Sequence, residues 1–290
     1  MSDSPVCELR AGALRAAVRP DLGGSLAGLW WQGEPLLRSC EPGLLAGPRQ
    51  SACFALLPYS IRIGHCRFDW RGQSYRTRPN FDDHPHSLHG VGWQRAWTVT
   101  AHTPDRLQLG LRHEPDADWP FAFSATQELQ LSEDALLWRL SLRSCDGREQ
   151  PAGLGWHPYF LHRAGSRLQT RVAGRWDMGA DALPCGRTEL PGLDLALAGA
   201  GLDHCFDGWS GEALVRDARH TLLLSASTRQ LVVFTPPGAA HFCVEPVSHV
   251  NNAVQDAEPL AQGLVALAPG ARLEAWMRLQ RRDPIPSELA

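Results

Sequence analysis

Four stretches of the chain place polar side chains among apolar or glycine residues, and they hold the residues best suited to chemistry. These stretches are LPYSIRIGHCRF (57–68), FDDHPHSLHGVGWQRAW (81–97), GLGWHPYF (153–160) and FCVEPVSHVNNA (242–253). A fifth and weaker one is GLDHCFDGW (201–209). A carboxylate with one or two histidines is the minimal equipment for general acid–base catalysis without a cofactor.

Glu245 and His157 are the first candidates for such chemistry. Glu245 lies in the apolar sequence CVEPV, and carboxylates are almost never fully buried unless they are paired or used. Apolar surroundings raise a carboxyl pKa toward that of a general base near neutral pH. The structural alternatives are a salt bridge from Glu245 to an arginine such as Arg62, and a core histidine at position 157. Asp203 is equally explained as the cap of a turn.

Three histidines at positions 84, 86 and 89 form the second cluster, and they first suggest a metal. For His84 and His86 we favour a solvated loop beside Asp82 and Asp83. His89 differs, because glycine and apolar residues follow it, and a buried structural histidine is the alternative there. We expect no bound metal and no other cofactor.

Composition excludes several classes of function. A net charge of −3 lacks the concentrated basic surface that nucleic acids require, and no apolar run is long enough to span a membrane. All 28 basic residues are arginine, and the absence of lysine excludes Schiff-base catalysis by lysine and P-loop nucleotide binding. Neither G-x-S-x-G nor G-x-G-x-x-G occurs. The eight cysteines are scattered and no signal peptide precedes them, so we expect reduced, mostly buried thiols and a cytoplasmic protein.

The sequence pattern around these residues predicts short strands. In RLQLGLRHE, leucines 107, 109 and 111 share one face, and ARLEAWMRLQR repeats the pattern with residues 273, 275, 277 and 279. Hairpins are predicted to turn at 132–134, at 71–72 and around 32–34. The pattern favours an all-β fold, a large antiparallel sandwich in a single domain over 1–290, with residues 282–290 as a tail.

Five segments, in order and over about residues 10–280, resemble the aldose 1-epimerase (galactose mutarotase) family. They are RPDLGGSLAGLWWQGEPLL, LPYSIRIGHCRFDWRGQSYRTRPN, SLHGVGWQRAW, GWHPYF, and the pair LDHCF and VEP. The resemblance implies a β-supersandwich with a solvent-facing sugar pocket and a small sugar as the partner, in a monomer or homodimer. The chain has 11 tryptophans and only 3 tyrosines, and tryptophan rings would suit such a pocket because they stack on the C–H faces of sugars.

The resemblance also implies roles for five residues. Glu245 corresponds to the base that takes the proton from the anomeric hydroxyl, and His157 to the acid that protonates the ring oxygen. We interpret His157 as held between Trp156 and Pro158. His89 corresponds to the second histidine at the anomeric centre. The residues that hold the other hydroxyls correspond to Arg62 and Asp203.

Two departures from the family pattern concern the sugar more than the reaction. Ile61 stands where the family usually has Asn, and Pro158 follows the histidine in place of Ser or Thr. The leading hypothesis is a cofactor-free mutarotase. Its alternatives are a hexose-6-phosphate mutarotase, for which Arg67 or Arg95 would have to reach the pocket, a non-catalytic sugar-binding protein, and a metal-dependent enzyme using histidines 84, 86 and 89.

Overall fold

The computed structural model describes residues 6–81 and 84–282. Asp82, Asp83 and most of the expected tail lie outside the described residues, whereas Arg282 pairs with Thr221 and belongs to a strand. Strands joined by turns and short 3-10 helices make up this part of the chain. Within it, no helix combines the length and apolar character needed to cross a membrane.

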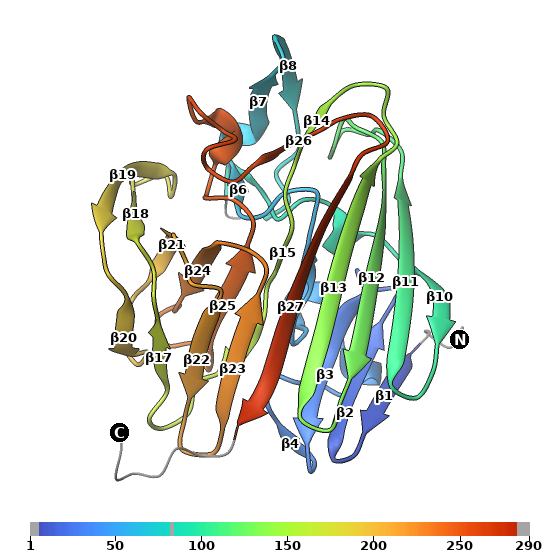
Figure 1. Cartoon of the computed structure of the whole chain (residues 1–290), viewed down its shortest axis with the longest axis vertical. Helices are drawn as coiled ribbons and strands as arrows, with labels where there is room; N and C mark the ends of the chain where they lie inside the picture. Colours follow the sequence, from blue (N-terminus) through green and yellow to red (C-terminus); the bar gives the residue numbers. More distant parts are fainter. Residues whose placement is uncertain (1–5, 82–83, 283–290) are drawn as a thin grey trace.

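The longest strands form a nine-stranded antiparallel sheet that runs along the long axis of the molecule (Figure 1). Its strands are, in spatial order, β10 (Thr98–His102), β11 (Arg106–His113), β12 (Phe123–Leu131), β13 (Ala135–Ser144), β27 (Arg272–Arg282), β23 (Thr221–Ala226), β22 (Glu212–Arg216), β17 (Arg167–Thr170) and β20 (Leu193–Ala196).

A second, eight-stranded sheet carries most of the polar stretches. Its strands are β19 (Pro184–Glu189), β18 (Gly174–Met178), β21 (Asp203–Asp207), β24 (Gln230–Phe234), β25 (His241–Val247), β15 (Gly155–Trp156) and β5 (Ala55–Leu56), with β16 (Tyr159–Leu161) also paired to β25. All pairings within this sheet are antiparallel.

A four-stranded sheet lies behind β12 and β13 in Figure 1, and short hairpins complete the fold. The sheet consists of β1 (Cys7–Ala11), β2 (Leu14–Arg19), β3 (Ser25–Trp31) and β4 (Glu34–Pro35). The pairs are β6 (Arg62–Ile63) with β9 (Ser87–Leu88), β7 (Arg67–Trp70) with β8 (Gln73–Arg76), and β14 (Gln150–Ala152) with β26 (Val265–Leu267). The 3-10 helices are η1 (Pro42–Leu44), η2 (Pro48–Gln50), η3 (Gly64–Cys66), η4 (Gly92–Gln94) and η5 (Ala253–Gln255).

The predicted all-β antiparallel sandwich and its three hairpins are confirmed. β12 and β13 pair across residues 132–134, β7 and β8 across 71–72, and β3 and β4 across 32–33. The alternating pattern also holds, because Leu107 and Leu109 are fully buried while Leu111 is half-buried. Their side chains join a hydrophobic core that extends between the sheets, and each fully buried leucine contributes about 1.5–3 kcal/mol. All eight cysteines are free, and five of them are buried.

Candidate active site

A cavity of about 310 Å³ collects the five residues that the sequence singles out. Residues of the eight-stranded sheet and of the β6–β9 region line it, together with irregular segments that precede and follow them. Its lining includes Glu245, His157, His89, Arg62 and Asp203. Groups that are far apart in sequence therefore share one pocket.

Strand register places the two carboxylates on one face of the eight-stranded sheet. Asp203 on β21 lies opposite Phe234 on β24, and Val232, two residues earlier on β24, lies opposite Glu245 on β25. Directly opposed residues and residues two apart point to the same side of a sheet. The alternation of β24 and β25 thus directs these four side chains into the pocket.

His157 lies between β15 and β16, where the chain crosses from one pairing to the next. Its backbone N–H donates to the Phe54 carbonyl at 3.0 Å. Its ring stacks on Phe54, with centroids 4.8 Å apart, and on Tyr159 at 4.5 Å. The aromatic rings that stack on the imidazole thus come from Phe54 and Tyr159, whereas support from Trp156 and Pro158 stays a prediction.

Arg62 enters the pocket from β6 and pairs with Asp203. Its Nη2 donates to the Asp203 carboxylate at 2.9 Å, and its backbone N–H donates to the Asn251 side chain at 3.1 Å. The arginine is buried, and the aspartate is 41% exposed. Arg62 is therefore not the ion-pair partner of Glu245, and Asp203 faces the pocket from β21 rather than capping a turn.

His89 is fixed through the backbone of Ile61. The Ile61 N–H donates to Nδ1 of His89 at 3.2 Å, and the His89 N–H donates to the Ile61 carbonyl at 2.8 Å. Because Nδ1 accepts, the proton of the neutral ring sits on Nε2. Ile61 itself has φ +58°, an outlier for a β-branched residue, so the surrounding structure holds this contact against local preference.

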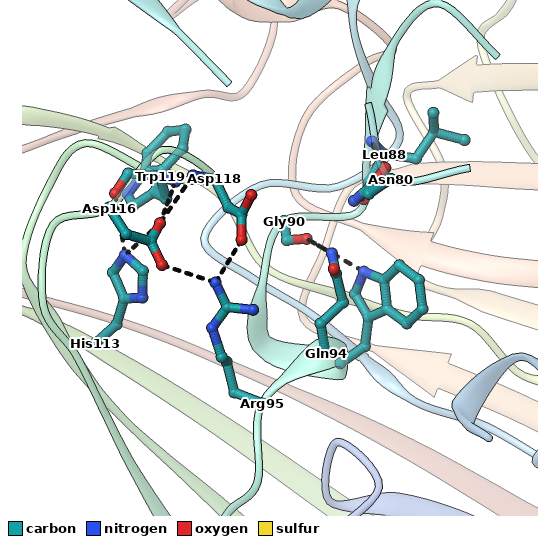
Figure 2. Close-up of polar contacts among 10 residues, drawn as sticks. Asn80, Leu88, Gly90, Gln94, Arg95, His113, Asp116, Asp118 and Trp119 are labelled. Atoms are coloured by element: carbon teal, nitrogen blue, oxygen red, sulfur yellow. Dashed lines mark hydrogen bonds and ion pairs between the residues drawn. The ribbon is translucent and has the colours of Figure 1, made fainter. Parts of the chain in front are cut away.

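The segment around His89 is held from both sides (Figure 2). The Asn80 amide both donates to and accepts from the backbone of Leu88, at 2.7 and 2.8 Å. On the other side, the Gly90 carbonyl accepts from Nε1 of Trp93 at 3.2 Å and from Nε2 of Gln94 at 3.3 Å. His89 is thus presented by a backbone anchored at the preceding and the following residue.

The catalytic candidates form a compact buried group. Nε2 of His157 lies 3.4 Å from Oε1 of Glu245, and the rings of His89 and His157 are 5.1 Å apart. Burial raises the pKa of Glu245 well above its ordinary value, with the charge of Asp203 as the next cause. Burial, with the charge of Arg38 as the next cause, lowers the pKa of His157 to about 3. Burial likewise holds the pKa of His89 well below the usual histidine value.

Several polar atoms in this group lack hydrogen-bond partners among the described residues. They are Oε2 of Glu245, Nδ1 of His157 and Nε of Arg62, all buried. Buried polar atoms are nearly always satisfied, and exceptions cluster at functional sites. Here the three atoms belong to residues that line the pocket, where a hydroxyl-rich ligand would supply hydrogen-bond partners.

Histidines 84, 86 and 89, which the sequence suggests as metal ligands, do not form a group of possible ligands in the described part of the chain. His86 is fully buried, accepts from the His65 N–H at 2.9 Å and bonds the Asp181 carbonyl at 2.7 Å, so a solvated loop is the wrong description of it. His84 and His89 line the cavity. Within residues 6–81 and 84–282, the group whose donor atoms could share an ion is His89, His157 and Glu245, all within 4.8 Å of one another.

Several pocket residues escape the sequence patterns. Arg38, Arg49, Phe81, Tyr159 and His241 also line the cavity. Tyr159 lies two residues after His157 in the same motif, and His241 lies four residues before Glu245 on β25, so alternation along the chain is a usable signal for both. Arg38 comes from the irregular segment after β4 and Arg49 from the short η2, and no periodic pattern points from either to the pocket.

Comparison with known proteins agrees with this fold. The model of the aldose 1-epimerase family matches residues 5–280. The uncharacterised protein YphB of Escherichia coli (strain K12) is 30% identical over 297 aligned residues, covering 94% of this chain and 97% of YphB.

Solved structures show the same architecture. A protein of Escherichia coli K12 with the provisional description aldose 1-epimerase is 28% identical, with a TM-score of 0.86 over 96% of this chain and 99% of its own. A galactose mutarotase-like protein from Clostridium acetobutylicum also gives a TM-score of 0.86, at 19% identity, over 96% of this chain and 95% of its own. These likenesses confirm the predicted galactose mutarotase-like supersandwich. Since the family model spans nearly the whole chain, the protein belongs to the aldose 1-epimerase family.

Proposed function

We propose that the protein is an aldose 1-epimerase that interconverts the α and β anomers of an aldose by acid–base ring opening and reclosure. The observation that carries this proposal is the buried contact of 3.4 Å between the His157 imidazole and the Glu245 carboxyl group. It lies in a pocket of about 310 Å³, at the lower end of the sizes that small-molecule sites have.

Ring opening needs one proton removed and one delivered. The Glu245 carboxylate takes the proton of the anomeric hydroxyl, the C1–O5 bond breaks as C1 becomes an aldehyde carbon, and the His157 imidazolium protonates O5. Rotation about C1–C2 exposes the opposite face of the aldehyde. Reclosure runs the transfers in reverse, so both groups return to their starting state. Each positioned acid or base contributes about 10²–10⁴-fold.

The pKa shifts of Glu245 and His157 leave the pair with the one proton that this cycle needs. Burial favours a protonated Glu245 and a neutral His157, so the pair holds one proton in total. Transfer of that proton from Oε1 to Nε2, across 3.4 Å, creates the carboxylate and imidazolium that ring opening requires. Sugar hydroxyls donating to the orphan Oε2 atom stabilise this ionised form, because hydrogen bonds to a carboxylate lower its pKa.

The remaining residues bind and orient the sugar. Neutral His89 presents its Nε2–H to the anomeric oxygen. The Arg62–Asp203 pair offers donors and an acceptor to ring hydroxyls, and Val232 and Phe234 give apolar contact to C–H faces. Holding the sugar in this geometry adds to the acid–base effect, since orientation lowers the entropic part of the barrier.

Polarimetry of freshly dissolved α-D-glucose and α-D-galactose tests the proposal. We expect the purified protein to accelerate the approach to the equilibrium rotation in proportion to its concentration. A protein that binds these sugars in titration calorimetry but leaves the rate at the buffer value would instead be a carbohydrate-binding module on the same scaffold.

A further inference from the structure

Two arginines of the pocket carry charge that no described carboxylate neutralises. Arg38 donates through Nε and Nη2 to the Ser51 carbonyl and through Nη2 to the Arg49 carbonyl, at 2.6–3.1 Å, and none of these bonds uses Nη1. Arg49 lies over the Phe81 ring at 4.4 Å. Within residues 6–81 and 84–282, neither guanidinium lies within ion-pair distance of an acidic group, in contrast to Arg62, which is paired with Asp203.

The position of Arg38 relative to His157 indicates which part of a sugar it would meet. Its guanidinium lies 3.6 Å from the centroid of the Tyr159 ring, and that ring stacks on His157. If His157 protonates O5 while Glu245 takes the proton of O1, then C1 lies toward Glu245, and C5 with its substituent C6 lies on the side of Arg38. The Arg62–Asp203 pair lies on the opposite side of Glu245, because β21, which carries Asp203, and β15, which precedes His157, flank β25 from different sides. This pair therefore marks the side of O1.

We propose that the substrate is an aldose with an anionic group at C6, either a carboxylate or a phosphate, and that Arg38 and Arg49 hold this group. This inference rests on the proposed function, since the roles of His157 and Glu245 orient the sugar. Guanidinium groups bind both anions through paired hydrogen bonds, and a fixed guanidinium loses little entropy in doing so. The backbone bonds of Arg38 fix it in this way.

An anion at this place also assists the chemistry. The charge of Arg38 is the second cause of the lowered pKa of His157, and it acts in the same direction on His241. Neutralising Arg38 with a bound carboxylate or phosphate removes this effect and favours the protonated imidazole. A neutral aldose leaves the charge in place. Substrate charge is therefore coupled to the protonation of the acid.

The arginines considered from the sequence do not serve this purpose. Arg95 lies beside Asp116 and Asp118 and donates to both, at 2.8 and 2.7 Å (Figure 2). Arg67 is exposed and lines a different surface depression, beside Ser74 and Gln255. Neither residue lines the cavity that holds Glu245.

Anomer exchange followed by NMR tests the proposal with defined probes. The panel is D-glucose, D-galactose, D-glucuronate, D-galacturonate and the two hexose 6-phosphates. We expect kcat/KM to be at least about tenfold higher for one anionic class than for the neutral sugars, through a lower KM. Preference for the uronates or for the phosphates identifies the anion. Equal or better turnover of neutral sugars overturns this inference alone, whereas no acceleration of any sugar overturns the proposed function itself.

Variants localise the effect. Arg38→Gln and Arg49→Gln are expected to reduce the ratio of anionic to neutral kcat/KM by about tenfold or more, since a hydrogen bond to a charged group corresponds to roughly 10–100-fold. Arg112→Gln is the matched control, because Arg112 is exposed on β11 and pairs with Glu114. A ratio that stays at the wild-type value in both pocket variants contradicts the proposal.

Discussion

His157 and Glu245 contact each other through Nε2 and Oε1 at 3.4 Å, although β15, β16 and β25 bring them together from distant parts of the chain. Both are buried, and burial displaces their pKa values in opposite directions. One proton shared between two such groups is a pattern typical of acid–base sites, where environments push paired pKa values apart.

The lowered pKa of His157 predicts a pH dependence of stability. The folded pKa of about 3 lies below the ordinary value of 6.5, so the folded state binds fewer protons than the unfolded state between these limits. The stabilising contribution is fully present above pH 6.5 and is lost as pH falls toward 3. We expect the free energy of unfolding, measured by urea titration, to decrease less steeply with falling pH in His157→Asn than in the wild type. The two slopes should differ by up to about 1.4 kcal/mol per pH unit between pH 6.5 and 3. Parallel curves for variant and wild type would refute this.

A backbone contact at Gly90 supports His89 and predicts a large substitution effect. Gly90 has φ +69°, and a Cβ there would lie 2.0 Å from the Leu57 carbonyl oxygen. Gly33 has φ +83°, but a Cβ at that position would meet no atom within 4 Å. Gly33→Ala should therefore cost only the conformational penalty of about 1–2 kcal/mol. Gly90→Ala should cost clearly more in the same denaturation assay and also lower kcat. Equal losses would mean that the close approach is unimportant.

The group of His89, His157 and Glu245 predicts a specific response to metals. We expect dialysis against a chelator to leave kcat/KM within about twofold, because the proton transfers use only side chains. Added Zn²⁺ should inhibit, since two imidazoles and a carboxylate within 4.8 Å suit this ion and its binding blocks both proton carriers. Chelator should then restore activity. Loss of activity on chelation, with recovery on adding Zn²⁺, would instead make the metal a cofactor.

Ile61 predicts a specificity effect. Its side chain lines the cavity, and its φ of +58° suits Asn far better than a β-branched residue. Ile61→Asn should lower KM for a hydroxyl-rich sugar by about 2–10-fold, the value of one net hydrogen bond. Ile61→Val is the control, because it keeps the branched side chain without an amide. Identical KM values for the two variants would show that position 61 does not contact the sugar.

The sequence predicts much of the fold because period-two alternation and turn residues are local signals. Leu107 and Leu109 are buried where alternation places them, and the three hairpins turn at the expected residues. The pairing of β25 between β24 and β15 is not a local signal, because it depends on contacts between distant segments. The family resemblance supplies this information, because it places Glu245 and His157 in one site on the basis of the sequence motifs.

The rest of the site could not be predicted for physical reasons. The aromatic support of His157 comes partly from Phe54, whose distance in sequence hides the contact. His86 looks solvated beside two aspartates, yet backbone groups of His65 and Asp181 satisfy both its nitrogens in the interior. Arg38 lies in an irregular segment, and only the fold shows that its guanidinium covers Tyr159.

In the proposed reaction, Glu245 carries the proton in ring opening. The most direct test is the rate of anomer exchange, measured by NMR with a sugar that the wild type turns over, in Glu245→Gln against wild type. The amide keeps the shape of the side chain but cannot accept the proton, so kcat should fall by about 10²–10⁴-fold while circular dichroism and thermal unfolding show a folded protein. A folded Glu245→Gln variant with wild-type kcat would show that Glu245 is not the base.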